Sequence, residues 1–311
     1  MSTQVTRTGA LGTGVLALSL ALWDPARGAG EEWPFPCDPD GIERYTAYRI
    51  EAPLAIDGHL AEPAWQAAPR SPRFEDLISG RVPIHDTRAA VLWDHQYLYI
   101  GVWLQEPDVQ ADLAERDAPI YNNNDAEVFI AGQDAYYEFE INALGTIYEV
   151  FFVWDEAYDR GGYAREPSLR KDHPQARPFS GVGLTTHPRG LRTGFWGYDL
   201  PGLEWAVQVD GTLNDSRDRD RGWTVELAFP WEGLKWVAAA DGRSLPPRDG
   251  DVWRVDFSRF NQYKEAPPAV DSGGWAWSSH GVWDSHVPEC FPFIRFSTDL
   301  RRGEEQPTAA P

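Results

Sequence analysis

The sequence predicts an all-β protein, an antiparallel β-sandwich of jelly-roll type with long loops. Short runs in which apolar and polar residues alternate recur along the chain, and Gly, Pro, Asp and Asn separate them. This pattern is typical of sandwiches and barrels. Helical periodicity is sparse, and the one short helix expected, at 62–68, has Pro63 where it suits a first helical turn. With 311 residues, the chain has ample material for one large β domain.

The clearest expected strands lie between residues 89 and 297. Strands 89–93 and 97–104 are separated by three polar residues, which predicts a hairpin. In the strand expected at 136–142, the odd-numbered residues are apolar and face one way, while the even-numbered ones face the other. The remaining expected strands are 127–131, 223–230, 252–260 and 291–297.

The two ends of the chain differ from the middle. Arg7 precedes an apolar stretch at 11–22, and small residues follow it, which predicts a signal peptide over residues 1–28. The stretch is too short to span a bilayer. We therefore expect an exported protein, periplasmic or extracellular, with no membrane insertion. The expected parts of the mature chain are an irregular lead at 29–45, the sandwich at 46–298 with an insertion loop at 160–175, and a disordered tail at 299–311.

Charge and aromatic content narrow the class of ligand. The formal net charge is −20, so the chain repels nucleic acid and anionic membrane surfaces, which need a basic field. The ligand classes that remain are neutral molecules and cations. The chain has 15 Trp residues, and Trp is rarely fully buried, which indicates that some indoles present a flat face to a ligand. The single Met is the initiator, which excludes the usual Met and His ligand pair of a haem.

The chain has only two cysteines, Cys37 and Cys290. Two thiols in an exported chain usually pair, so we expect a disulfide between them. The bond would join the lead to the last strand. In the loop-entropy account such a bond is worth about 4–5 kcal/mol, as an upper figure.

Seven phrases of this sequence, in order, resemble those of the family-nine carbohydrate-binding modules. Each phrase alone is weakly specific, but the set covers roughly residues 46–298. The phrases are AIDGHLAEPAW (55–65), VLWDHQYLYIGVWLQEP (91–107), NNDAEVFI (123–130), YYEFEINALG (136–145), GWTVELAFPW (222–231), WRVDFSR (253–259) and the closing WAWSSHGVWDSHVPECFPFIRFS (275–297).

The resemblance implies a fold, a ligand and partners. Modules of this family are jelly-roll β-sandwiches, often hold calcium, and are usually attached to polysaccharide-degrading enzymes. They clamp a terminal sugar between two aromatic rings. The resemblance thus implies an exported protein that binds the ends of plant-type polysaccharides or oligosaccharides of the xylan or glucan class. It implies no catalytic residue and no obligatory cofactor, a structural calcium ion, and association with a polysaccharide-degrading enzyme.

Carried over position by position, the resemblance implies five sugar-binding residues. Tyr121 and Trp283 correspond to the two clamp rings. Glu127 corresponds to the family's acidic hydrogen-bonding residue, and Glu140 and Asn142 to its basic and amide pair. Two positions depart from the family pattern, since Glu140 stands where the family has Arg and Tyr121 where it has Trp. The departures predict an altered pocket polarity and sugar preference.

Three alternatives remain open from the residues alone. Glu140 and Asn142 could simply form the solvent face of an alternating strand. A glycoside hydrolase would need two carboxylates across the scissile bond. Calcium could instead stabilise an adhesion or interaction module, with the acidic segment 210–222 as one candidate site, although its arginines offer self-neutralisation. Strand carboxylates that could serve a hydrolase are Glu127, Glu138, Glu140 and Glu226.

Overall fold

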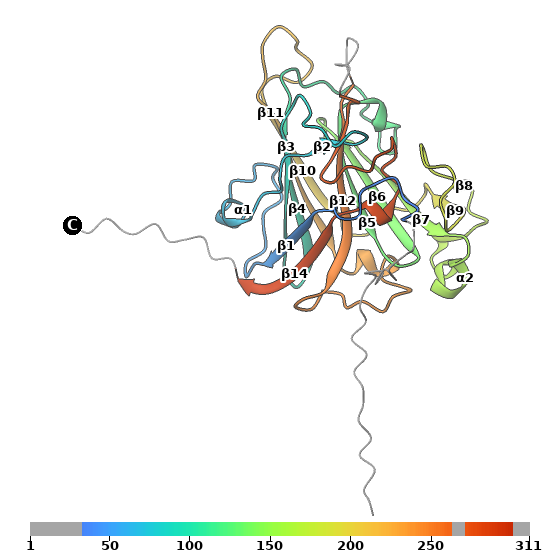
Figure 1. Cartoon of the computed structure of the whole chain (residues 1–311). Coiled ribbons are helices and arrows are strands. Elements are labelled where there is room, and N and C mark those ends of the chain that lie inside the picture. The colour runs from blue at the N-terminus through green and yellow to red at the C-terminus, as the bar shows by residue number, and fades with distance from the viewer. Residues whose placement is uncertain (1–32, 263–270, 301–311) are drawn as a thin grey trace, which may run out of the picture. The chain divides into compact units, whose positions relative to one another are not determined.

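The computed structural model describes residues 33–262 and 271–300 (Figure 1). The predicted signal peptide, 1–28, and nearly all of the predicted tail lie outside the described residues. Within the described ranges no helix is both long enough and apolar enough to cross a membrane.

Strands dominate the described chain, and the helices are single turns or little more. The strands are β1 (Arg44–Arg49), β2 (Glu75–Asp76), β3 (Thr87–Trp93), β4 (Tyr97–Gln105), β5 (Asp125–Ala131), β6 (Ala135–Asn142), β7 (Ile147–Trp154), β8 (Ala176–Phe179), β9 (Arg192–Phe195), β10 (Glu204–Asp210), β11 (Gly222–Pro230), β12 (Val252–Phe260), β13 (Gly274–Ala276) and β14 (Phe293–Leu300). The helices are α1 (Pro63–Ala67) and α2 (Tyr158–Gly161), with 3₁₀ turns η1 (Ile120–Asn122), η2 (Tyr163–Arg165), η3 (Pro167–Leu169), η4 (Gly233–Trp236) and η5 (Pro288–Cys290).

The strands hydrogen-bond along one continuous path in the order β10-β11-β4-β3-β1-β14-β12-β5-β6-β7-β9-β8. Neighbours are antiparallel except around β1, which pairs in parallel with both β14 and β3. The path folds over on itself, so that strands distant in the order face each other. The ring of Phe139 on β6 lies 5.7 Å from that of Phe229 on β11, centroid to centroid. The fold is therefore the predicted all-β sandwich.

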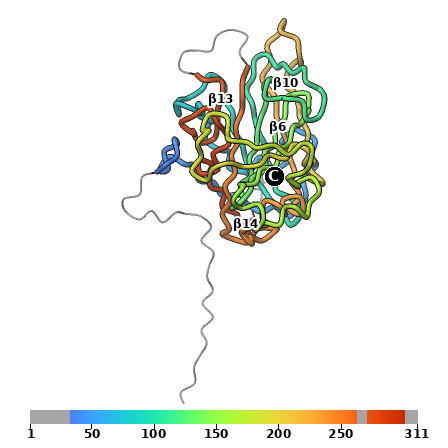
Figure 2. Tube along the Cα trace, turned by 90° about the vertical axis from the view of Figure 1, so that its right-hand side faces the viewer, coloured from blue at the N-terminus to red at the C-terminus, as the bar shows by residue number. Residues whose placement is uncertain are grey.

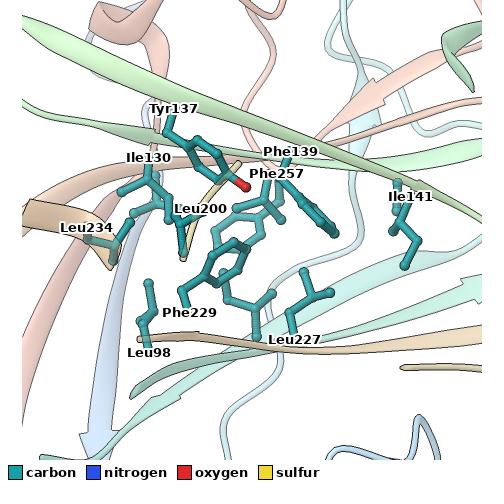
Figure 3. Close-up of a cluster of buried hydrophobic side chains, with 14 of the residues drawn as sticks. Leu98, Ile130, Tyr137, Phe139, Ile141, Leu200, Leu227, Phe229, Leu234 and Phe257 are labelled. Carbon is teal, nitrogen blue, oxygen red and sulfur yellow. The ribbon is translucent and has the colours of Figure 1, made fainter. Parts of the chain in front are cut away.

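The space between the two layers holds the main hydrophobic core. Figure 3 shows Tyr137, Phe139 and Ile141 extending from one layer toward Phe229 and Leu227 on the other. These three are the odd-numbered residues of β6, so the alternation in the sequence assigned their side chains to the correct face. The predicted hairpin is also present, as β3 paired with β4.

The even-numbered residues of β6 face the opposite way, but they do not face solvent. Tyr136 belongs to a second cluster of buried rings with Phe152 on β7, and the two rings stack 4.7 Å apart. Glu140 and Asn142 are also buried. The interpretation that these two form a solvent-exposed face is therefore wrong, because other segments cover this side of the sheet.

One covering segment runs from the end of β7 to the start of β10. It pairs with the sheet through β9 and places Phe179 and Trp196 over Phe152, with ring centroids 4.9 and 5.9 Å away. The yellow-green part of the tube that faces the viewer in Figure 2 is this segment. The insertion loop predicted at 160–175 is partly wrong, since it contains helical turns. Tyr163 and Leu169, both fully buried, anchor those turns to the main core.

The lead is joined to the last part of the chain. Cys37 and Cys290 form the predicted disulfide, with their Cα atoms 5.9 Å apart. Around it, Trp33 and Phe35 pack against a small cluster that contains Val287. The described part of the lead is thus held against the domain.

Candidate ligand-binding cleft

A cleft of about 440 Å³ lies on the covered side of the sheet, over β5, β6 and β7. Four of the five predicted sugar-binding residues line it: Tyr121, Glu127, Glu140 and Trp283. The other lining residues are Phe129, Glu138, Tyr148, Phe152, Arg177, Phe179, Val182, Trp196, Phe260, Gln262, Asp284, Ser285 and His286.

The floor of the cleft follows from strand register. Glu127 on β5 pairs directly with Glu140 on β6, and Glu140 pairs in turn with Tyr148 on β7. Paired residues point to the same face of a sheet. Glu138, two residues before Glu140, adds a third carboxyl group to this face. Ordinary alternation on adjacent strands therefore brings three acids together.

Two rings at the cleft keep part of their surface open to solvent. Tyr121 is 47% exposed and Trp283 is 38% exposed, although both are large apolar side chains. Tyr121 packs at 82° to Tyr148, with centroids 5.9 Å apart, and Trp283 packs at 79° to Phe260, at 4.9 Å. Each exposed ring is thus braced by a near-perpendicular neighbour that also lines the cleft.

Gly274 makes room for the Trp283 ring. A Cβ atom at this position would lie 2.7 Å from Cζ3 of Trp283 and 2.8 Å from Cε1 of Phe260. Real Cβ contacts are longer than this, so a larger residue would displace one of the two rings. Gly274 is therefore a positioning residue for the ring.

Burial dominates the ionisation of the floor. It raises the pKa of Glu127 to about 8, against hydrogen bonding from Ser258, whose hydroxyl donates to Oε2 at 2.6 Å. Burial likewise raises the pKa values of Glu138 and Glu140 well above their ordinary range, and the neighbouring Glu127 charge adds to this. The same two causes raise the pKa of Asp125, which lies on β5 next to the floor. Near neutral pH the free floor therefore retains protons.

Asp284 ties together the two loops at one side of the cleft. Its Oδ2 accepts hydrogen bonds from three consecutive backbone N–H groups, those of residues 182–184, each at 2.9 Å. Its Oδ1 accepts one from the backbone N–H of His286 at 2.8 Å. Burial lowers the pKa of His286 to about 3, so its ring is neutral where it faces Glu138, 3.4 Å from Nε2 to Oε1. His286 therefore adds no positive charge beside the floor.

Asn142 lies outside the cleft, and its amide is occupied within the protein. Its Nδ2 donates to the backbone oxygen of Leu113 at 2.8 Å. Its Oδ1 accepts from the backbone N–H groups of Leu144 and Thr146, both at 3.1 Å. The structure therefore does not bring Asn142 together with the other four predicted residues, and its amide has a structural role. Through a further bond to Asn123, Asn142 holds the loop that carries Tyr121.

The sequence interpretation missed several residues of the cleft. Phe179 and Trp196 form part of its wall, and Gln262 lies at its edge. None of them belongs to a matched phrase, and the first two come from the covering segment. The only available signal was the aromatic content of a stretch that otherwise resembles a polar loop.

The described residues contain two groups of three acids whose oxygens could hold a cation. In the first, Asp57, Glu62 and Glu226, both oxygens of Glu226 already accept protein hydrogen bonds. The second is Asp125 with Glu127 and Glu140, at the floor of the cleft, where the three ligand oxygens lie within 4.8 Å of one another. Carboxylate oxygens at this spacing suit a hard cation such as calcium.

The segment 210–222, a candidate calcium site, uses its acids internally. Asp210 pairs with Arg221 at 2.6 Å and Asp215 with Arg217 at 2.5 Å. Asp220 accepts hydrogen bonds from backbone N–H groups. This is the self-neutralisation that the sequence indicated.

Two other hollows in the described chain lack a pair of open rings. One, of about 500 Å³, is lined by Trp103, but the Arg70 guanidinium already covers that ring, 3.9 Å from its centroid. The other, of about 450 Å³, has no Phe, Tyr or Trp in its lining. The cleft over β5, β6 and β7 is therefore the best candidate site.

The architecture is the all-β sandwich that the sequence predicted, and solved structures share it in part. A solved structure from Bacteroides uniformis, a protein provisionally assigned as carbohydrate-binding, aligns with a TM-score of 0.50 at 15% identity. The alignment covers 82% of this chain and 100% of that one. At this identity the likeness concerns the fold alone.

Two structures of a family-nine carbohydrate-binding module from Caldicellulosiruptor kristjanssonii are more distant. The complex with glucose aligns with a TM-score of 0.43 at 11% identity, over 82% of this chain and 96% of that one. The complex with cellotriose aligns with a TM-score of 0.42 at 12% identity, over 86% of this chain and 100% of that one. No protein-family profile matches the sequence. No curated protein matches it either.

Proposed function

We propose that this protein binds carbohydrate, holding the end of a polysaccharide or oligosaccharide of the xylan or glucan class between Tyr121 and Trp283. The observation that carries the proposal is that these two exposed rings line one cleft together with a floor of hydrogen-bonding carboxyl groups. The C–H face of a pyranose is apolar and stacks on aromatic rings, while its hydroxyl groups need directed partners. Glu127 and Glu140 are placed to provide them.

The cellular setting is part of the same proposal. The disulfide between Cys37 and Cys290 favours an oxidising compartment, in agreement with the signal peptide predicted at 1–28. We expect the protein in the periplasm or outside the cell, working with a separate polysaccharide-degrading enzyme. The fold shared with the B. uniformis protein supports the proposed carbohydrate ligand, since that protein is provisionally assigned to carbohydrate binding. Calcium remains a prediction.

The decisive experiment combines a glycan array with calorimetry on the best ligand. We expect Tyr121→Ala and Trp283→Ala each to weaken binding about 5- to 30-fold, since stacking on one ring is worth roughly 1–2 kcal/mol. The double variant should not bind detectably. Trp103→Ala, which removes an indole outside the cleft, is the matched control and should bind as the wild type does. Unchanged affinity in a folded double variant would refute the proposal.

Two further readings of the same experiment address the alternatives. Reading the array with and without a chelator tests whether binding needs calcium. Release of reducing sugar from the bound glycan would instead indicate a glycoside hydrolase, which the raised pKa of Glu127 favours because catalytic acids are tuned in this way. We expect no release. Turnover that Glu127→Gln abolishes while binding persists would establish the hydrolase.

A further inference from the structure

In the described chain, the carboxyl groups at the floor of the cleft have no directly paired Lys or Arg side chain. Glu127, Glu138 and Glu140 line the cleft, and Asp125 lies beside them. Among the described residues, neither Lys nor Arg makes an ion pair with any of these four, and the one histidine near Glu138 is neutral. Arg177 also lines the cleft, but its side chain is exposed. The guanidinium groups of Arg192 and Arg259 act on Glu138 and Asp125 only at a distance, and each partly offsets the rise in pKa that burial causes. Among the described residues, the carboxyl groups of the floor are therefore concentrated and have no directly paired Lys or Arg side chain.

Two oxygen atoms of the acidic group also lack a hydrogen-bond donor. Oε2 of Glu140 and Oδ2 of Asp125 are buried and unpartnered, in side chains of residues only 2% and 0% exposed. The remaining oxygens are partly used, since the backbone N–H of Phe260 donates to Oδ1 of Asp125 at 3.0 Å. A buried polar atom without a partner costs free energy, and one in a binding site indicates a missing ligand. A ligand that donates hydrogen bonds, through a hydroxyl or an ammonium group, would satisfy these oxygens.

The spacing of the oxygens suits a protonated amine. Charge-assisted N–H···O bonds are about 2.8 Å long, so two acceptors of one tetrahedral ammonium group lie about 4.6 Å apart. The oxygens of Asp125, Glu127 and Glu140 lie within 4.8 Å of one another.

The walls of the cleft favour an organic cation over a metal ion. A hard metal ion takes oxygen ligands alone, so it would use the floor of the cleft and make no contact with the aromatic lining. Tyr121, Trp196 and Trp283 instead offer faces and edges for a sugar ring and for a nearby ammonium group, which aromatic faces attract. One cleft thus offers aromatic rings for the sugar ring of an amino sugar and carboxyl groups for its ammonium group.

We propose that the cleft selects a sugar end with a free, protonated amino group, a hexosamine, over a neutral sugar with the same ring. This inference rests on the carbohydrate binding proposed above, and it replaces the neutral xylan or glucan end by an amino-sugar end. The acid at Glu140, paired with Glu127 across the strands, is the specificity-determining residue. N-acetylation of the amine would remove the charge and with it the preference.

The test compares glucose, glucosamine and N-acetylglucosamine by calorimetry at pH 6, where an ordinary amine is protonated. We expect glucosamine to bind at least tenfold more tightly than either neutral sugar, which corresponds to about 1.4 kcal/mol. In Glu140→Gln this ratio should fall below threefold. Glu115→Gln, which removes an exposed carboxyl outside the cleft, is the matched control and should keep the wild-type ratio. Melting temperatures confirm that both variants are folded.

The outcomes separate this inference from the proposed function. Equal affinity for all three sugars would overturn the amine preference and leave carbohydrate binding intact. Binding of neutral glycans on the array without any binding of glucosamine would do the same. If calcium chloride alone stabilises the wild type but not Glu140→Gln, and glucosamine shows no preference, the acidic group is a metal site and the inference is wrong. Absence of binding to every carbohydrate overturns both proposals.

Discussion

Glu127 should make the folded state less stable as the pH rises. Burial raises its pKa to about 8 in the folded chain, whereas an exposed glutamate has its pKa near 4.5. Between these values the unfolded chain has released the proton and the folded chain retains it. The folded state binds more protons, so the free energy of unfolding falls with rising pH. The loss begins near pH 4.5 and is complete above pH 8.

The effect of Glu127 on stability is best measured above pH 6.5. Below this pH, two histidines change the free energy of unfolding in the opposite direction. Burial lowers the pKa of His286 to about 3 and that of His85 to about 4, so both oppose folding at acidic pH. At pH 6.5 each ring is still half-protonated in the unfolded chain, and by pH 8.5 both rings are neutral in both states, so their opposing contribution over this interval is only about 0.8 kcal/mol in total and does not depend on Glu127. Over that interval Glu127 still has to lose its proton, and each pH unit up to its folded pKa is worth about 1.4 kcal/mol. The expected loss from this group is about 2 kcal/mol.

Differential scanning calorimetry of the wild type and Glu127→Gln tests this reasoning. A loss of about 2 kcal/mol lowers the melting temperature by about 4–8 °C in a domain of this size. Between pH 6.5 and 8.5 the melting temperature of the wild type should therefore fall by about 4–8 °C more than that of Glu127→Gln. The melting temperature of Glu115→Gln should change as that of the wild type does. Parallel profiles for Glu127→Gln and the wild type would show that Glu127 is already ionised in the folded state, and the reasoning would fail.

Three further predictions concern other parts of the fold. Replacing Cys37 and Cys290 by Ser should lower the free energy of unfolding by up to about 5 kcal/mol in urea titrations, and an unchanged midpoint would contradict this. Gly274→Ala should weaken ligand binding more than it lowers stability, because it displaces the Trp283 ring; calorimetry that finds wild-type affinity would exclude that role. Trp93→Ala should cost about 3–5 kcal/mol of stability, since its ring is buried in the main core, and a melting temperature within 2 °C of the wild type, equivalent to under about 1 kcal/mol, would argue against it.

Local patterns predicted the fold where one strand face differs from the other. Alternation in β6 separated the core residues from the residues on the cleft side. Four of the residues that the resemblance assigned to the sugar site, Tyr121, Glu127, Glu140 and Trp283, line the cleft. β7, Ile147–Trp154, was missed because it is buried on both faces, and from Val150 to Trp154 it is a continuous apolar run without alternation. Such a run cannot be told from a buried helix by periodicity.

The covered side of the sheet could not be predicted for a different reason. Its burial depends on a segment that returns to the sheet some forty residues after β6, and nothing in local sequence specifies that return. The partners of Asn142 are likewise distant in the sequence: its amide bonds to Leu113 and Asn123, in the loop before β5, which local sequence does not specify. Phe179 and Trp196 enter the cleft with the segment that returns to the sheet.

The position of β14 has a consequence for how the chain completes its fold. The last strand lies between β1 and β12 in the sheet, and it joins five strands on one side to those on the other. In a nascent or translocating chain that ends before Phe293, β14 is missing, so the strands on its two sides form two separate sheets. The edges of these sheets, β1 and β12, then lack their partner. Pairing of β1 with β14 spans nearly the whole described sequence, which makes it a late and slow contact. Until β14 has formed, the chain would expose strand edges with unpaired N–H and C=O groups, which are prone to aggregation. A chaperone that shields such edges would have its greatest effect in that interval.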